Sequence, residues 1–425
     1  MKRVTMIMGA GAPLDLNLPG DVTCPSTTNI TKKVIEPYDI VLNPGVKTNL
    51  VERIYDKLKA SFPVNHNLWW IENQQPNIHF EILFHVMEQL RAYDIVWQGN
   101  CKNPDIYPYF APFIQRNFDF SRDELSAVME PFIIRIMDIV NAYNEYYKKH
   151  KNEESWFADF FNMNHKWDVF NFNYDTMVEE SLDSYEDGYE DVRGEAYQKF
   201  SPLKLHRNKL GLSTINHLHG CILYYYKKNW NIDASDTTIH DLYKYPDYHT
   251  VKGMMEGRSQ SKEVSQTNEE YFAGPIITGL KKTDKLSCIP YDFYHGNLYK
   301  ALYSSNALVI VGYSFGDIYV NNLIRMMNML YGEKKRIVII DKWSQKEINS
   351  ESRGLEKYIQ SNISKQELNF WMAMSGCDYD KLINSFLQKD VTKVMKSPNN
   401  CLMILADGFK SAAKHKDEIE EFLNS

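Results

Sequence analysis

Five short clusters of glycine and polar residues stand where runs of apolar residues end, and they are the part of the chain that could do chemistry. Glycine allows close backbone approach, histidine exchanges a proton near neutral pH, and asparagine and aspartate hold hydroxyl or amide groups. The clusters are Gly9-Ala10-Gly11, Asn173-Tyr174-Asp175, His219-Gly220, the string GYSFGD from Gly312 to Asp317, and Asp341. We interpret them as parts of one ligand-binding or catalytic site.

The glycine turn at residues 9–11 follows a short run of apolar and β-branched residues, which predicts a strand. Such a turn lets backbone N–H groups approach a pyrophosphate at a helix N-terminus. A tight turn without a ligand fits equally well, because the third glycine of the dinucleotide fingerprint is missing. The string PLDLNLP, residues 13–19, predicts a loop rather than a helix, placed to close over a ligand.

His219 is the candidate general base, because it follows the strand predicted at residues 215–218 and Gly220 leaves space beside it. His217 shares the same strand face and competes for this role. An isolated histidine is also common as a purely structural residue. The position at the carboxyl end of the strand favours His219.

Asn173 and Asp175 alternate after the strand predicted at residues 168–172, so we expect both side chains to face the same crevice. An asparagine there can hold a ribose hydroxyl or a water molecule, and the aspartate can accept from an amide or hydroxyl. An ordinary turn is the alternative interpretation.

These clusters need a scaffold that brings the strand ends together. Residues 307–311 and 336–340 are continuous apolar runs, which are typical of central parallel strands. Helical periodicity follows residue 317. The alternation of strand, turn and helix predicts an α/β fold, a Rossmann-like doubly wound parallel sheet with a large helical insertion and a small C-terminal tail. Ligands of such sheets bind outside the carboxyl ends of the strands.

The sequence predicts two regions, a catalytic domain at residues 1–342 and a mostly helical C-terminal region at residues 343–425. The catalytic domain contains a helical insertion at about 43–164 and a lid-like polar insertion at about 221–275. Ser121 and Glu124 form a capping box that predicts the start of the longest helix of the insertion. We expect the C-terminal region to serve oligomer or partner contacts.

Composition argues against several kinds of partner and site. The chain has 48 Lys and Arg against 55 Asp and Glu, a net charge of −7, so direct nucleic-acid binding is not expected. No apolar run reaches the roughly 18 residues of a membrane span, and the N-terminal apolar run is too short for a signal peptide, so we expect a cytoplasmic protein. The six cysteines lack the paired spacing of a structural zinc site, so no metal is expected.

Four strings in this order resemble the sirtuin superfamily, in particular the bacterial sirtuin-like branch of anti-phage defence. They are GAGAPLDLNLP, FNFNYDTMVEE, INHLHG, and LVIVGYSFGD followed by RIVIID. The resemblance implies NAD bound at the sheet edge and cleavage of the bond between nicotinamide and ribose. It implies that Asn173 and His219 are catalytic and that Asp175 lies near the nicotinamide carboxamide. The further residues implied in cofactor binding are Gly9, Ala10, Gly11, Pro19, Gly312, Ser314, Asp317 and Asp341.

The departures from the family pattern separate two chemistries. The four-cysteine zinc module of protein deacylases is missing, and Ala12-Pro13 replaces the serine that often follows the glycine turn. We therefore expect an NAD glycohydrolase with NAD as substrate. The alternatives are a catalytically idle module that senses NAD or ADP-ribose and, less favoured, a deacylase. The resemblance further implies NAD depletion in abortive infection and a trigger or partner. Because the chain after Asp341 is too short for a large repeat sensor, we expect a homo-oligomer with a separate partner, a HerA-type ATPase or another defence partner or phage trigger.

Overall fold

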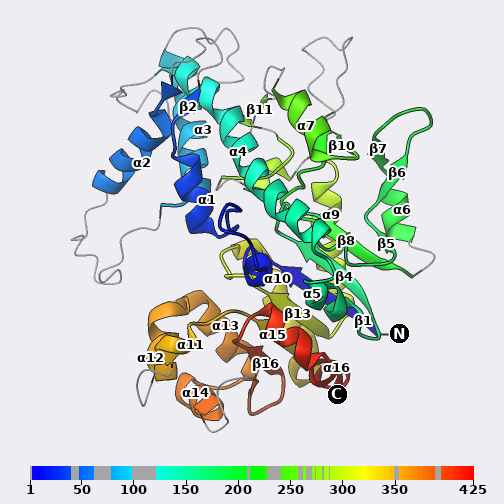
Figure 1. Ribbon diagram of the computed structural model, residues 1–425. Coiled ribbons are helices and arrows are strands. Elements are labelled where there is room, and N and C mark those ends of the chain that lie inside the picture. The colour runs from blue at the N-terminus through cyan, green and yellow to red at the C-terminus, as the bar shows by residue number, and fades with distance from the viewer. Residues whose placement is uncertain are drawn as a thin grey trace.

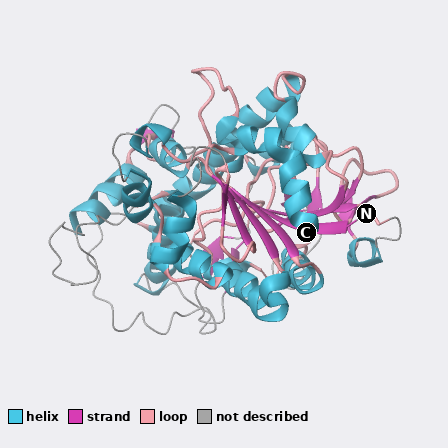
Figure 2. Cartoon of the chain, turned by 90° about the horizontal axis from the view of Figure 1, so that it is seen from below, coloured by secondary structure: helices cyan, strands magenta, loops and turns pink. Residues whose placement is uncertain are grey.

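An eight-stranded sheet forms the centre of the protein in the computed structural model, with helices on both of its sides (Figures 1 and 2). The structure describes residues 2–39, 47–61, 78–97, 121–207, 211–226, 241–256, 262–264, 270–272, 274–279, 282–286, 288–348, 354–387 and 394–425. The N-terminal helices lie on one side of the strand ends, and the helices of the C-terminal region lie on the other (Figure 1).

The strand order of the sheet is β15-β16-β14-β13-β1-β4-β8-β5. Its parallel strands are β1 (Lys2–Met8), β4 (His165–Asn171), β5 (Tyr185–Glu186), β8 (Ser213–His217), β13 (Ala307–Val311), β14 (Arg336–Ile340) and β16 (Leu402–Leu405), and β15 (Met395–Lys396) runs antiparallel to β16. Numbered along the chain, the six strands from β8 to β16 have the order 3-2-1-4-5-6 of the doubly wound dinucleotide-binding fold. The predicted fold class is confirmed.

The point where this order reverses lies between β1 and β13. The chain builds outward from β1 through β4 to β8, then returns to the other side of β1 with β13. Ligands of doubly wound sheets bind at such a point, because loops from both halves diverge there and leave a crevice. The residues of β13 are fully buried, as their continuous apolar sequence predicts.

The helical insertion between β1 and β4 is present, although part of residues 43–164 lies outside the described residues. The described helices from β1 to β4 are α1 (Thr27–Val34), α2 (Leu50–Ser61), α3 (Phe80–Trp97), α4 (Arg122–Lys149) and α5 (Ser155–Phe161). Helix α4 begins after Ser121 with the predicted capping box to Glu124, and it continues through Pro131 as one helix. None of the described helices is long and apolar enough to cross a membrane.

The segment between β8 and β13 contains more regular structure than a lid-like loop. A second sheet, of order β6-β7-β10-β9, joins two strands that precede β8 to two strands of this segment. The first two are β6 (Tyr189–Asp191) and β7 (Gln198–Phe200), and the other two are β9 (Tyr224–Tyr226) and β10 (Leu242–Lys244). The segment also holds α7 (Tyr248–Met255), β11 (Lys262–Val264), β12 (Glu270–Phe272), α8 (Lys282–Lys285) and α9 (Tyr291–Ser304). Much of the predicted lid lies outside the described residues, so that interpretation stays a prediction.

The C-terminal region completes the main sheet instead of forming a separate tail. Its described helices are α11 (Gln345–Ile348), α12 (Gly354–Asn362), α13 (Lys365–Ser375), α14 (Tyr379–Leu387), α15 (Phe409–Ala412) and α16 (Lys416–Asn424). Strand β16 pairs with β14 in parallel from Ile337 to Ile340. The sheet therefore continues across the boundary predicted at residue 342.

Candidate active site

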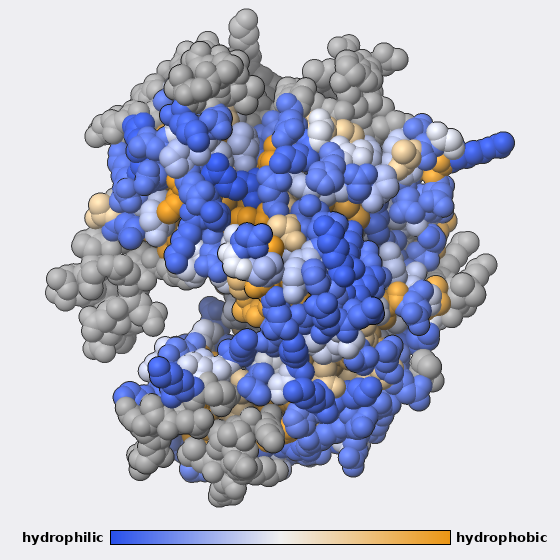
Figure 3. All heavy atoms as spheres, viewed as in Figure 1, coloured by the Kyte–Doolittle hydropathy of each residue, from blue (hydrophilic) through white to orange (hydrophobic). Residues whose placement is uncertain are grey.

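The carboxyl ends of the strands lie beside a hollow in the molecular surface, between the part that carries α1 and the part that carries α12 (Figures 1 and 3). Hydrophilic residues cover most of the face that Figure 3 shows, with smaller hydrophobic areas between them. Six of the predicted site residues lie at these strand ends, which makes this place the candidate active site: Gly9, Gly11, Asn173, His219, Gly312 and Asp317.

Two glycine turns touch each other at the switch point. The Gly11 N–H donates to the Gly312 carbonyl at 2.9 Å. A Cβ atom on Gly9 would lie 2.5 Å from the Gly312 oxygen, and one on Gly11 would lie 2.6 Å from the Gly312 Cα. Gly312 itself has a φ of +57°, which side chains disfavour. The glycines are thus required for contact between the β1 and β13 turns, whatever ligand they also approach.

The segment after the glycine turn differs from the predicted loop. Residues Ala12–Asp15 form a short 3-10 helix, η1, with Pro13 in its first turn. Pro is favoured there because its fixed φ suits a helix start and its missing N–H is not needed. The loop begins at Leu16, and Pro19 within it is exposed and accepts a hydrogen bond from the Val22 N–H at 3.0 Å.

Asn173 links the end of β4 to the glycine turn of β1. Its Nδ2 donates to the Gly9 carbonyl at 3.0 Å, and its backbone N–H donates to Asn171 Oδ1 at 2.9 Å. The side chain is buried. Since Nδ2 is engaged, the amide oxygen is the group of Asn173 that can accept from a ligand hydroxyl or water.

His219 lies at the end of β8, almost completely buried, with its ring edge-on to Phe172 at 4.7 Å. Its Nε2 is 3.8 Å from Asp317 Oδ2. Burial and the charge of Lys282 together lower the pKa of His219, against the opposing effect of Asp317. The imidazole is therefore neutral at neutral pH, as a general base must be.

Asp317 is the last residue of the loop formed by the GYSFGD string, and this loop places it beside His219. Its Oδ1 accepts from the Val320 N–H at 3.2 Å and caps helix α10 (Ile318–Tyr331). Burial opposes ionisation of this carboxyl, but hydrogen bonding and attraction to His219 outweigh it and lower the pKa of Asp317 to about 2. Asp317 is therefore a carboxylate at every physiological pH.

Ring packing and hydrogen bonds hold the loop from Gly312 to Asp317 in place. The Tyr313 ring lies 5.2 Å from the Phe172 ring, and its hydroxyl bonds Asn321 Oδ1 at 3.1 Å. Phe315 has a φ of +56°, which is rare for a residue with a side chain. Its buried ring packs on Phe370, and its carbonyl accepts from Asn321 Nδ2 at 2.7 Å. Ser314 is exposed beside these fixed residues.

Three charged or titratable residues near His219 were not marked by any sequence pattern. Lys282 Nζ pairs with Glu81 Oε1 at 2.8 Å, which joins α8 to the start of α3. Burial opposes ionisation of Glu81, but the charges of Lys282 and His219 lower its pKa. His295 of α9 is buried, and burial together with the His219 charge lowers its pKa to about 4. The segments that carry these residues have no motif, so only folding brings them to the site.

Asp175 and Asp341 are placed differently from the group around His219. Asp175 is buried, with Oδ2 accepting from Tyr143 at 2.9 Å and Oδ1 from the Met177 N–H at 3.1 Å, and burial raises its pKa. Both carboxylate oxygens of Asp175 are thus engaged by protein groups. Asp341 follows β14, where burial raises its pKa and its Oδ1 accepts from the Lys342 N–H at 2.8 Å.

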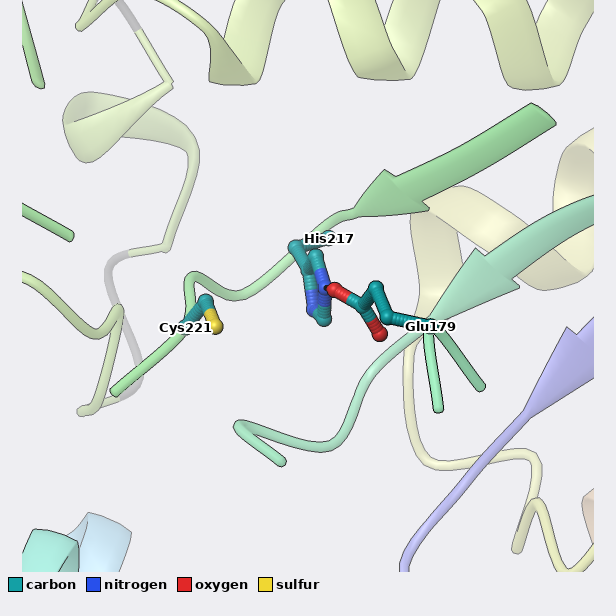
Figure 4. A group of neighbouring side chains, drawn as sticks. All are labelled: Glu179, His217 and Cys221. Atoms are coloured by element: carbon teal, nitrogen blue, oxygen red, sulfur yellow. Dashed lines mark hydrogen bonds and ion pairs between the residues drawn. The ribbon is translucent and has the colours of Figure 1, made fainter. Parts of the chain in front are cut away.

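His217 is engaged in a buried ion pair. Its Nε2 lies 2.6 Å from Glu179 Oε1, and Cys221 lies beside them, with potential ligand atoms of all three within 4.8 Å (Figure 4). Burial lowers the pKa of His217, but the charge of Glu179 outweighs it and raises the pKa overall. Burial raises the pKa of the Cys221 thiol, so it keeps its proton. In this geometry the group is an ion pair next to a thiol.

The comparisons with known proteins cover the site residues that follow β1 and its glycine turn. No curated protein matches the chain significantly. Residues 168–362 match the family model described as the SIR2-like domain. The match begins within β4 and includes Asn173, His219 and the loop from Gly312 to Asp317, whereas the turn at residues 9–11 precedes it. Over residues 168–362, the chain is therefore similar to a SIR2-like domain.

Proposed function

We propose that the protein is an NAD glycohydrolase that converts NAD and water to nicotinamide, ADP-ribose and a proton. The observation that carries this proposal is the arrangement at the switch point. Neutral His219 and buried Asn173 lie at the ends of adjacent strands, and Asn173 is hydrogen-bonded to the glycine turn of β1. A site of this kind can hold a dinucleotide across the crevice and present its ribose to a base.

The bond to be broken needs little chemical assistance. Nicotinamide leaves as a neutral molecule, taking the electron pair of the glycosidic bond, while positive charge develops on the ribose. A water oxygen then bonds to the same ribose carbon and gives its proton to the base. His219 serves as that base, directly or through a ribose hydroxyl, because its lowered pKa keeps it unprotonated. The Asn173 amide oxygen orients the hydroxyl or the water.

Phosphate binding at this site would rest on backbone groups. The carboxyl ends of β1 and β13 carry η1, the two glycine turns and exposed Ser314. Peptide N–H groups and a hydroxyl can hold a diphosphate without an excess of basic side chains. This accords with the net charge of −7.

The direct test is product analysis with purified protein and NAD. We expect nicotinamide and ADP-ribose from the wild type, and a loss of about 10²-fold or more in His219→Ala and Asn173→Ala, the scale of a positioned general base. His206→Ala is the matched control, because His206 is exposed on α6 (Pro202–Arg207). Full activity in both site variants would overturn the assignment. NAD binding without turnover would instead indicate a sensing module, and turnover only with an acylated peptide would indicate a deacylase.

The cellular role in this proposal is NAD depletion during anti-phage defence, with a homo-oligomer and a HerA-type ATPase or another trigger as partners. The resemblance of the sequence motifs supports it. A plaque assay with parallel measurement of NAD tests this role, using cells that express wild type or His219→Ala. Equal phage growth and equal NAD in both strains would contradict it.

A further inference from the structure

We propose that Asp317 is the positioning residue of His219, with one carboxylate oxygen fixed by the helix and the other orienting the imidazole. This inference rests on the proposed function, in which His219 removes a proton. It gives Asp317 a role toward a protein side chain in addition to the place in cofactor binding that the sequence resemblance implies.

The two oxygens of Asp317 have separate partners. Oδ1 accepts from the Val320 N–H at 3.2 Å as the cap of α10, and Oδ2 lies 3.8 Å from His219 Nε2. The Asp317 N–H also donates to the Tyr313 hydroxyl at 3.2 Å. The carboxylate is thus held by its own helix, so it does not need His219 to fix its position.

The loop that delivers Asp317 is fixed by contacts that offset an unfavourable backbone. Phe315 holds a left-handed φ of +56°, which is unfavourable for a residue with a side chain. Its carbonyl accepts from Asn321 Nδ2 at 2.7 Å and its ring packs against Phe370. Such conformations persist where the surroundings over-determine them, and they concentrate at functional sites.

The titratable groups that face His219 come from four places in the chain. Asp317 is the N-cap before α10, Lys282 lies in α8 and Glu81 in α3, while His295 of α9 is neutral at physiological pH. Lys282 and Glu81 pair with each other at 2.8 Å, and the lysine lowers the pKa of His219 whereas the glutamate raises it. Asp317, whose Oδ2 lies 3.8 Å from Nε2, adds a carboxylate that favours an imidazolium at His219.

A carboxylate beside one ring nitrogen selects a tautomer. Asp317 opposite Nε2 favours the proton on Nε2, which leaves Nδ1 as the acceptor. During cleavage Nδ1 takes the proton of the attacking water or ribose hydroxyl, and the Nε2 proton stays in place. Asp317 then stabilises the imidazolium until its proton is released to solvent. The 3.8 Å contact is longer than a hydrogen bond, and contacts of catalytic groups often shorten only when substrate binds.

Asp317→Asn separates the two roles of this side chain. Asparagine caps a helix as well as aspartate does, so α10 should keep its start and the melting temperature should stay near that of wild type. The negative charge is lost, so we expect kcat to fall by about 10²-fold while KM for NAD changes little. Asp317→Ala should show the same loss of kcat together with a lower melting temperature.

The pH profile provides a readout that a purely structural role would not move. Activity needs neutral His219, so the acidic limb follows its pKa. Removing the negative charge in Asp317→Asn should shift that limb to lower pH. Removing the neighbouring positive charge in Lys282→Gln should shift it to higher pH. Opposite shifts from the two variants would support Asp317 as the electrostatic partner of His219.

The outcomes separate this inference from the proposed function. Wild-type kcat and an unshifted acidic limb in Asp317→Asn, with His219→Ala inactive, would overturn the role of Asp317 alone. Absence of NAD cleavage in the wild type would overturn the proposed function. In that case the NMR titration of His219, assigned by loss of its signal in His219→Ala, still tests the contact. An equal His219 pKa in wild type and Asp317→Asn would then overturn it, and a lower one in the variant would support it.

Discussion

Asp317 Oδ2 lies 3.8 Å from His219 Nε2, although the strands that precede these residues, β13 and β8, are separated in the sheet by β1 and β4. The loop from Gly312 bridges this distance, and Tyr313 within it contacts Phe172 at the end of β4. Strand ends on opposite sides of the switch point therefore contribute to one site. Activity should depend on how firmly this loop is anchored at its base.

Gly312→Ala should weaken the anchoring of this loop at its first residue. A Cβ atom there would lie 2.4 Å from the Ala12 nitrogen, and the φ of +57° disfavours any side chain. We expect the free energy of unfolding in urea to fall by roughly 1–3 kcal/mol, and NAD cleavage to fall with it. Gly316→Ala is the control in the same loop, since its Cβ would meet Ser314 Oγ at an ordinary 3.6 Å. Equal stability of the two variants would show that the turns do not need their close contact.

Asn173→Asp should fail in spite of its similar shape. The replacement removes the Nδ2 donor, so a carboxylate oxygen would face the Gly9 carbonyl across the present 3.0 Å. An unpaired buried acceptor costs about 1–3 kcal/mol, and the turn of β1 would be displaced. We expect both a lower urea midpoint and a loss of NAD cleavage comparable to that of Asn173→Ala. A stable and active Asn173→Asp would mean that the amide donor is dispensable.

The buried pair of His217 and Glu179 should make stability depend on pH in both directions. The folded pKa of His217 is raised above its ordinary 6.5, so its contribution is present below pH 6.5 and is lost as pH rises through the raised value. Burial raises the pKa of Glu179, but the charge of His217 outweighs this effect and lowers it below 4.5. The contribution of Glu179 is therefore lost as pH falls through the lowered value.

Removing one partner of this pair tests its importance. Glu179→Gln should lose about 3–5 kcal/mol of unfolding free energy near pH 6, because it leaves a buried histidine without its counter-charge. The exposed pair of Lys33 and Glu36 is the comparison, and Glu36→Gln should cost at most about 1 kcal/mol. Urea titrations at several pH values measure both variants. A flat pH response of the wild type would contradict the ion pair.

Glu367 should act in the opposite sense, as a buried acid that prefers its proton. Burial, with repulsion from Asp341, raises the pKa of Glu367 to about 8 from an ordinary 4.5. Between these values the folded protein holds a proton that the unfolded chain has released, so stability falls as pH rises. Glu367→Gln should therefore be more stable than wild type at pH 8, whereas Glu421→Gln, at an exposed position, should not. Melting temperatures of the wild type and the two variants from pH 5 to pH 9 test this expectation, and an equal pH response of wild type and Glu367→Gln would contradict it.

The parts of the fold that follow from local patterns could be predicted. Continuous apolar runs predicted β13 and β14 with the bounds that the structure has, and the capping box predicted where α4 begins. The candidate residues at the strand ends could also be predicted from the sequence, because parallel strands bring their carboxyl ends to one edge of the sheet. Asn173 meets the glycine turn of β1 for this reason, and His219 follows the adjacent strand β8.

Long-range contacts account for what could not be predicted. The approach of Asp317 to His219 depends on the path of a loop across two strands. The pairing of Lys282 with Glu81 depends on how α3 folds back against α8, and no sequence spacing specifies it. Position at the strand end favoured His219 over His217, but the ion pair that engages His217 could not be predicted, since its partner Glu179 lies 38 residues earlier.

The pairing of β16 with β14 has a consequence for any attempt to isolate the catalytic half of this molecule. Cutting the chain at residue 342 would remove β16, which pairs with one side of β14. The buried, apolar residues from Ile337 to Ile340 would then have unpaired backbone groups on that side. Such an edge is a template for adding strands from other molecules, and it invites aggregation. Residues 343–425 thus cover the edge that β14 would otherwise present, and the two regions should melt in a single transition.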